Sequence, residues 1–241
     1  MALFTTYNQV GKAESVSDLI SLITPSDTPM FSLMKTEKVN ARTFSFLEDT
    51  LRAGSLNAKA EGSAATMVTL LNATERTNNT QILEESFQIS RTSDAIKTHG
   101  RATETAMQTG KALKTIKKDL EFSLIGVDQA SVNTNAGTPR RMASIINQMS
   151  TAVDAGSNAT DALTEAKLLT AGQTAYVAGS SPNVLMVKPA DSQILAGFAA
   201  ASGRNRELSQ TKTLVNVVDL YVSPYGEYKV ILNRHLLATH A

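Results

Sequence analysis

The sequence predicts an α+β protein in which strands and helices occupy separate stretches of the chain. Three observations carry this prediction: an alternating segment at 42–49, a helical apolar period over 101–130, and mixed helices and strands after Arg141. Aromatic residues are 5% of the 241, whereas Ala, Thr and Ser together number 81. Because large rings supply much of a compact core, we expect long, thinly packed elements rather than an enzyme domain with an aromatic-lined pocket.

The composition excludes several classes of protein. Lys and Arg number 23 against 22 Asp and Glu, and no region is a basic tail, so a duplex-binding domain is not indicated. Cysteine is absent, which excludes disulfide frameworks, thiolate metal sites and a cysteine nucleophile. No signal peptide opens the sequence, and no apolar run approaches the roughly 18 residues of a membrane span. We therefore expect a cytoplasmic origin and no membrane partner.

The N-terminal region is predicted to be a short amphipathic arm. Apolar residues recur at helical spacing over 14–23, and Pro25 ends this helix. A second proline, Pro29, keeps the chain extended or turned and presents Met30 and Phe31 at its end. An apolar segment after rigid chain suits docking, either onto a neighbouring molecule or onto its own domain.

Two strands are predicted next, at 42–49 and 80–90. Phe44 and Phe46 alternate with Thr and Ser in the first, and the second alternates in part. Residues 51–79 between them are too polar to form a core. A connection this long is either disordered or an extension that meets a partner.

The strongest helix is predicted over 101–130, as a rod of roughly 40 Å. A short helical turn precedes it, with Ser93 or Asp94 as its cap, and Gly100 separates the two. Gly110 lies within the rod, where we expect it to allow close approach of another backbone. The face opposite the apolar stripe carries lysines, interpreted as a solvated surface or, alternatively, a weak nucleic-acid contact: Lys111, Lys114, Lys117 and Lys118.

A second domain of α/β type is predicted after the polar loop at 133–141. Its expected elements are a helix at 161–177, a strand at 183–187, a helix from Pro189 to about Ala201, and a hairpin of 214–223 and 228–232. The hairpin turn contains a glycine that can adopt positive φ.

No arrangement typical of an enzyme was found in the sequence. Gly110 and Lys111 lack the remainder of a phosphate-binding loop. His235 and His240 are five residues apart, which does not place both on one helical face as a zinc site requires. We therefore predict no catalytic residue, no metal ligand and no cofactor.

Four stretches occur in a characteristic order: 23–32 (ITPSDTPMFS), 58–64 (AKAEGSA), 100–122, and 232–235 (LNRH). Together with the succession of arm, strand, long loop, strand, long helix and α/β domain, they resemble the major capsid proteins of tailed bacteriophages, whose architecture is called the Johnson fold. The resemblance covers nearly the whole chain.

The resemblance implies four parts. They are an N-terminal arm at 1–35, an extended loop with flanking strands at 36–90, a peripheral domain with its spine helix at 91–130, and an axial domain at 131–241. Members of the family normally continue past the LNRH segment with a returning strand of the peripheral domain, which we expect to be absent from this chain.

The resemblance also implies a structural role. Copies of the chain would assemble into hexamers and pentamers, in the cytoplasm of a bacterial host, and close an icosahedral virion shell around packaged double-stranded DNA. Expected partners are the chain itself, a portal protein, scaffolding or cement proteins, and DNA by non-specific contact. An encapsulin-like shell and, less favoured, a small-molecule enzyme are the alternatives. The residues expected at subunit contacts are Pro25, Pro29, Met30, Phe31, Lys59, Glu61, Arg140, Arg141, Arg204 and Arg206.

Overall fold

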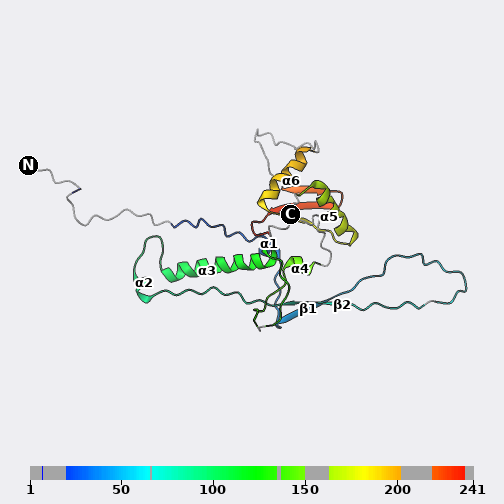
Figure 1. Ribbon diagram of the computed structural model, residues 1–241, viewed down its shortest axis with the longest axis horizontal. Helices are drawn as coiled ribbons and strands as arrows, with labels where there is room; N and C mark the ends of the chain where they lie inside the picture. Colours follow the sequence, from blue (N-terminus) through cyan, green and yellow to red (C-terminus); the bar gives the residue numbers. More distant parts are fainter. Residues whose placement is uncertain are drawn as a thin grey trace, which may run out of the picture. The chain divides into compact units, whose positions relative to one another are not determined.

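A computed structural model describes residues 7, 20–65, 67–134, 137–149, 163–201 and 219–236. The chain forms two compact units, each assembled from two separate stretches. The first unit combines Met1–Thr28 with Leu83–Asp119, and the second combines Pro29–Ile82 with Leu120–Ala241. Helices and strands both occur, which confirms the mixed α and β class (Figure 1).

The first unit contains a short helix and most of the long one. Helix α2 spans Arg91–Ala95 and is capped by Ser90, whose hydroxyl accepts the N–H of Ser93, so the expected cap at Ser93 or Asp94 is wrong. Gly100 then adopts a φ of 75°, where a glycine is favoured. Helix α3, Glu104–Glu121, begins three residues later than expected for the rod. Lys111, Lys114 and Lys117 are exposed in the single subunit, and Lys118 is half-buried.

The long helix ends earlier than its apolar period predicts. A π-helical turn, η2 at Phe122–Gly126, follows α3, and Val127 is already extended. A Cβ built on Gly126 would lie 2.4 Å from the Phe122 ring and 2.8 Å from the carbonyl oxygen of His235. The expected helix to residue 130 is therefore wrong, because a tertiary contact with a residue far along the chain sets the helix end.

Replacing Gly126 with alanine is expected to lower the free energy of unfolding by about 1–3 kcal/mol, since the new methyl group overlaps the Phe122 ring and a backbone carbonyl. The matched control is Gly110→Ala in α3, where nothing lies within 4 Å of the added Cβ. That change should stabilise the isolated subunit by up to about 1 kcal/mol through helix propensity. Urea unfolding followed by circular dichroism measures both, and equal effects would contradict the packing argument.

The second unit begins with helix α1, Pro29–Leu33. Proline occupies the first helical position, where its missing N–H costs nothing, so of the extended or turned path expected here the chain takes a helical turn from Pro29. Of the amphipathic helix expected over 14–23, residues 20–23 are not helical and 14–19 lie outside the described residues. Among residues 20–42, all are exposed except 28–31, so the described arm contacts the protein at one short segment.

Strands β1, Thr43–Glu48, and β2, Thr74–Asn79, form a two-stranded antiparallel sheet. The prediction of β1 is confirmed. The prediction of a strand at 80–90 is wrong: that segment carries no strand, and the polar sequence TERTNN pairs instead. The position of β2 is therefore determined by its pairing with β1 and by the hydrogen bonds that flank it, and not by an alternation of apolar residues.

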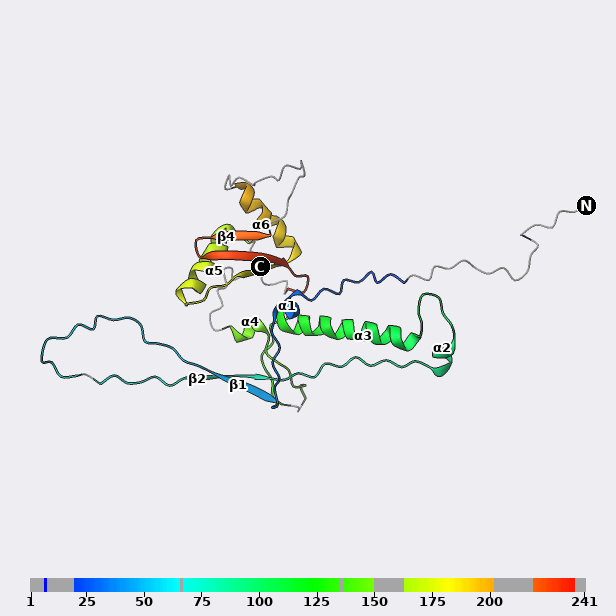
Figure 2. The ribbon, with the colours of Figure 1, turned by 180° about the vertical axis from the view of Figure 1, so that it is seen from behind.

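The α/β region of the second unit is a three-stranded sheet with two helices. Its elements are α5 (Glu165–Val177), β3 (Val184–Val187), α6 (Pro189–Ala201), β4 (Leu220–Ser223) and β5 (Gly226–Leu232). The strand order is β3-β5-β4, with β3 parallel and β4 antiparallel to β5 (Figure 2). The predicted helices, strand and hairpin are confirmed where described.

The core of this region lies between the sheet and its helices. Leu195 of α6 packs with Tyr221 and Tyr228, whose rings stack at a centroid distance of 6.3 Å. Partly buried side chains from α5, α6 and the sheet surround them: Leu168, Leu185, Phe198 and Val230. Apolar residues from both helices therefore cover one face of the sheet.

Candidate functional site

A fully buried carboxylate, Glu121, joins the end of α3 to the start of α1. Its Oε1 accepts the N–H of Met30 and its Oε2 accepts the N–H of Phe31, both at 2.8 Å. These two amides belong to the first turn of α1, where backbone N–H groups lack helical partners. Glu121 thus caps a helix that is 90 residues away in sequence and fixes the arm at its shielded segment.

Asn233, also fully buried, completes this arrangement after β5. Its Nδ2 donates to Glu121 Oε1 at 2.6 Å, its Oδ1 accepts the N–H of His235, and its own N–H donates to the carbonyl of Val187. Every group bonded to the Glu121 carboxylate in these contacts is a donor, which suits a side chain that only accepts when ionised. We call Glu121, Met30, Phe31 and Asn233 the Glu121 junction.

The base of the β1–β2 hairpin is bonded to the segment that follows η2. The N–H of Ala143 donates to Asn78 Oδ1 at 2.9 Å, and Asn79 Nδ2 donates to Ser131 Oγ at 2.5 Å. Ser144 is fully buried and exchanges hydrogen bonds with the backbone of Gln129. These contacts hold the hairpin on the second unit although its strands bury little apolar surface.

The long connection between β1 and β2 is an extended loop, residues 49–73. In Figure 1 it leaves the two strands as separate limbs that meet at a tip. Near the tip, Ser63 N–H donates to the carbonyl of Ala60, and Gly62 adopts a φ of 80°. Several large apolar side chains of the loop are at least 69% exposed: Leu51, Leu56, Met67, Val68, Leu70 and Leu71. Contiguous apolar exposure of this kind is typical of an interaction surface.

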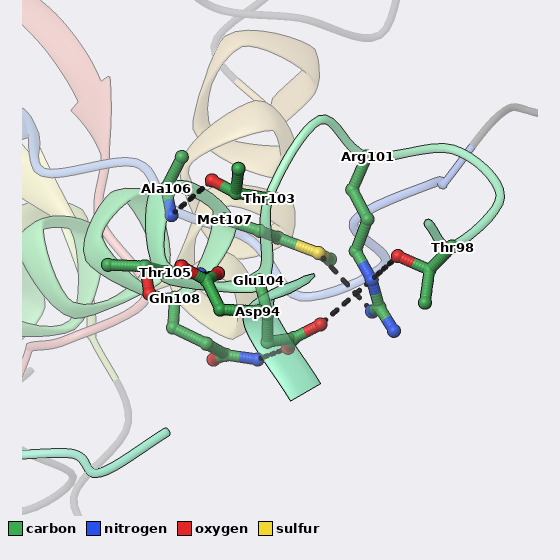
Figure 3. Close-up of polar contacts among 9 residues, drawn as sticks. All are labelled: Asp94, Thr98, Arg101, Thr103, Glu104, Thr105, Ala106, Met107 and Gln108. Atoms are coloured by element: carbon green, nitrogen blue, oxygen red, sulfur yellow. Dashed lines mark hydrogen bonds and ion pairs between the residues drawn. The ribbon is translucent and has the colours of Figure 1, made fainter. Parts of the chain in front are cut away.

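The beginning of α3 is held by a separate polar network (Figure 3). Asp94 Oδ1 accepts the N–H of Thr105 at 3.0 Å and so caps α3 from α2. Arg101 Nε lies 2.8 Å from Glu104 Oε2 and donates to Thr98 Oγ1. The network fixes the reversal of the chain between the two helices.

Replacing Asp94 with alanine is expected to destabilise the subunit by about 1 kcal/mol, because one first-turn amide of α3 loses its acceptor. Asp94→Asn keeps an acceptor oxygen and serves as the control, with a smaller loss. Thermal unfolding measures the difference. An alanine variant as stable as the asparagine variant would show that the cap contributes nothing.

The structure places the expected contact residues in five different settings. Lys59 and Glu61 are exposed near the loop tip, and Pro25 is exposed on the arm. The amides of Met30 and Phe31 bond within the chain, to Glu121. Arg140 donates a side-chain hydrogen bond to the carbonyl of Thr80, and Arg141 donates one to the carbonyl of Ala130. Pro29 occupies the first position of α1. Arg204 and Arg206 lie outside the described residues.

Sequence reasoning missed Glu121 and Asn233 as organising residues. Both lie in stretches that carry the family resemblance, 100–122 and 232–235, so a signal was present. The backbone N–H groups that donate to Glu121 could not be identified from the sequence, because they belong to a segment about 90 residues away. In the described part of the chain, no group of three His, Asp or Glu side chains is placed to hold a metal ion. None of its helices combines the length and apolar character needed to cross a membrane.

Comparison with known proteins agrees over nearly the whole length. A family model described as SU10 major capsid protein matches residues 3–241. A curated relative, the major capsid protein of Escherichia phage Phieco32, is 28% identical over 282 aligned positions, which cover 96% of this chain and 80% of the relative. The match includes all three stretches that form the Glu121 junction.

Proposed function

Since this chain belongs to the SU10 major capsid protein family, a family of structural head-shell subunits, we propose that its copies assemble into hexamers and pentamers. These capsomers close an icosahedral shell around packaged double-stranded DNA. Membership in a capsid family makes an enzyme unlikely and makes the protein a component of the virion. The relationship to a phage capsid protein favours a head shell over an encapsulin-like compartment.

The observation that carries the proposal is the extended loop at 49–73. Its large apolar side chains are at least 69% exposed in the single subunit, whereas the strands that carry it pair with each other and are bonded to later segments at Asn78 and Asn79. The strands hold the ends of the loop, and its apolar side chains are exposed to solvent along both limbs. These side chains become buried only when a neighbouring subunit covers them. Many such contacts, each modest, give a closed shell high stability while allowing errors to reverse during assembly.

The proposed architecture is the Johnson fold, with the four parts expected from the sequence. Support comes from the order of the elements: α1, the β1–β2 hairpin with its extended loop, the long α3, and then the α/β region. In this proposal the arm is 1–35, the extended loop with its strands 36–90, the peripheral domain 91–130 and the axial domain 131–241. The portal, scaffolding or cement proteins and the inner DNA are the proposed partners, and assembly takes place in the bacterial cytoplasm.

Electron microscopy of the purified protein tests the proposal. Closed shells, or rings of five and six subunits, are expected at high protein concentration. A protein that stays monomeric at every concentration and salt condition, alone and with its neighbouring head gene products, would overturn it. Shells that enclose a cargo protein instead of DNA in the infected cell would favour the encapsulin-like alternative.

A further inference from the structure

Two arginines line one groove beside the start of β1. The groove is formed by Arg42, Ile82, Asn133, Thr134, Pro139 and Arg140. Within the described residues, no carboxylate forms an ion pair with Arg42 or with Arg140. Two guanidinium groups in one groove without an anionic partner are a ready anion-binding arrangement, because each presents donors suited to an oxyanion.

Hydrogen bonds hold the walls of this groove in place. Arg140 Nε donates to the carbonyl of Thr80 at 2.9 Å, which orients its guanidinium. The carbonyl of Arg42 accepts both the N–H and the hydroxyl of Thr80, at 3.0 and 3.1 Å. On the opposite wall, Asn133 Nδ2 donates to Thr43 Oγ1. Thr80 thus links the backbone of Arg42 to the side chain of Arg140, so the Arg140 side of the groove is held in place within the chain.

The surroundings of the two arginines favour a protein carboxylate over a nucleic-acid phosphate. Ile82 is 78% exposed and Pro139 is exposed, so the groove offers apolar surface for the methylene groups of an acidic side chain. A duplex backbone binds to an extended row of cations, since affinity grows with each phosphate neutralised. The groove instead presents one pair of arginines.

We infer that the Arg42–Arg140 groove binds the Glu61 carboxylate of a second copy of this chain. The inference rests on the proposed function, because it requires neighbouring copies in a shell. Glu61 is exposed beside the turn at Gly62, and no described cation forms an ion pair with it. Glu48, Glu104 and Glu121 are engaged within the chain. Glu61 is the one acidic residue of 54–66, the segment around the loop tip.

The direction of β1 separates Glu61 from the groove of its own chain. The groove lies before Thr43, whereas the loop leaves the strand after Glu48 at the opposite end. Six strand residues span about 20 Å, and the thirteen residues from Glu48 to Glu61 reach at most about 45 Å farther. In Figure 1 the two limbs of the loop continue away from the strands. We therefore assign the partner of Glu61 to the groove of another copy.

A charge exchange tests the inference. Arg42→Glu and Glu61→Arg are each expected to lower the yield of shells at least about tenfold, because every subunit contact then opposes like charges. The double variant, Arg42→Glu with Glu61→Arg, is expected to recover part of the yield, since copies of one chain again supply opposite charges at positions 42 and 61 while Arg140 stays cationic. Sedimentation and negative-stain microscopy measure the shells, and circular dichroism verifies that each variant folds.

Two matched charge reversals serve as controls: Lys38→Glu in the exposed segment before β1 and Glu84→Arg on an exposed segment after β2. Both should leave the shell yield unchanged. Single variants that fail without recovery in the double variant would overturn the pairing of these two residues. A different result would also overturn the inference: Glu61→Arg forms normal shells, and the shells of Arg42→Glu retain less DNA than those of the parent. The groove would then bind the phosphate groups of DNA. If the parent protein itself forms no shells, the proposed function is refuted. This outcome is distinguishable from a failure of the Arg42–Glu61 pairing, in which the parent protein does form shells.

Discussion

Replacing Glu121 with alanine is expected to lower the free energy of unfolding by about 3–5 kcal/mol. The carboxylate is fully buried, and its removal leaves the N–H groups of Met30 and Phe31 and the side-chain amide of Asn233 without their acceptor. Burying donors without a partner costs more than the hydrogen bonds contribute when formed. Urea unfolding of the dispersed subunit, monitored by circular dichroism, measures the change.

Glu121→Gln distinguishes the hydrogen bonds from the volume of the side chain. Glutamine fills the same space and keeps one acceptor oxygen, but its amide nitrogen then faces a donor. We expect a loss between that of the alanine variant and zero, together with faster proteolysis of the exposed arm residues that flank α1. A glutamine variant that matches the parent in both measurements would show that the second carboxylate oxygen contributes nothing.

Deleting residues 54–66 is expected to abolish stable shells and leave a folded subunit. The deleted segment belongs to the extended loop, whose described side chains are exposed, so the single subunit loses almost no buried surface. Neighbouring subunits lose Leu56 and the charged groups of Lys59 and Glu61, whereas the other exposed large apolar side chains of the loop remain. Microscopy scores the shells, and the thermal midpoint of the dispersed subunit should change by no more than about 5 °C, within the effect of about 1 kcal/mol.

A second loop variant separates length from chemistry. Replacing 54–66 by a Gly/Ser segment of equal length keeps the reach of the loop and removes its side chains. This variant should also fail to form stable shells. Normal shells from the deletion would show that the loop is not needed for assembly, and normal shells from the Gly/Ser variant would show that only its length matters.

Local chemistry allowed several elements to be predicted from the sequence. Pro189 marks the start of α6 because its ring fits the first helical turn, and Gly226 closes the β4–β5 turn with a φ of 146°. The alternation of Phe44 and Phe46 identified β1 correctly. In each case the residues that determine the element lie inside it or beside it, so a reading of a few neighbouring positions was sufficient.

Elements that depend on distant residues were not predicted. Helix α1 begins where Glu121 accepts its first amides, and the end of α3 is set where Gly126 meets the carbonyl of His235. Strand β2 is polar and is selected by its pairing with β1 and by Asn78 and Asn79 bonding to later segments. The exposure of Lys59 and Glu61 follows from the polar sequence around them, whereas the Arg42 groove requires three separate segments to meet.

The Glu121 junction has a consequence for the timing of synthesis. Glu121 bonds to Met30 across 91 positions and to Asn233 across 112, so its contacts are among the most non-local kind. Such contacts form late, since the entropy of closing the intervening chain must be offset first. A ribosome must therefore release Asn233 before the junction closes and α1 is fully held. Nascent chains are thus expected to carry an undocked arm, which delays productive encounters between copies until translation has passed this residue.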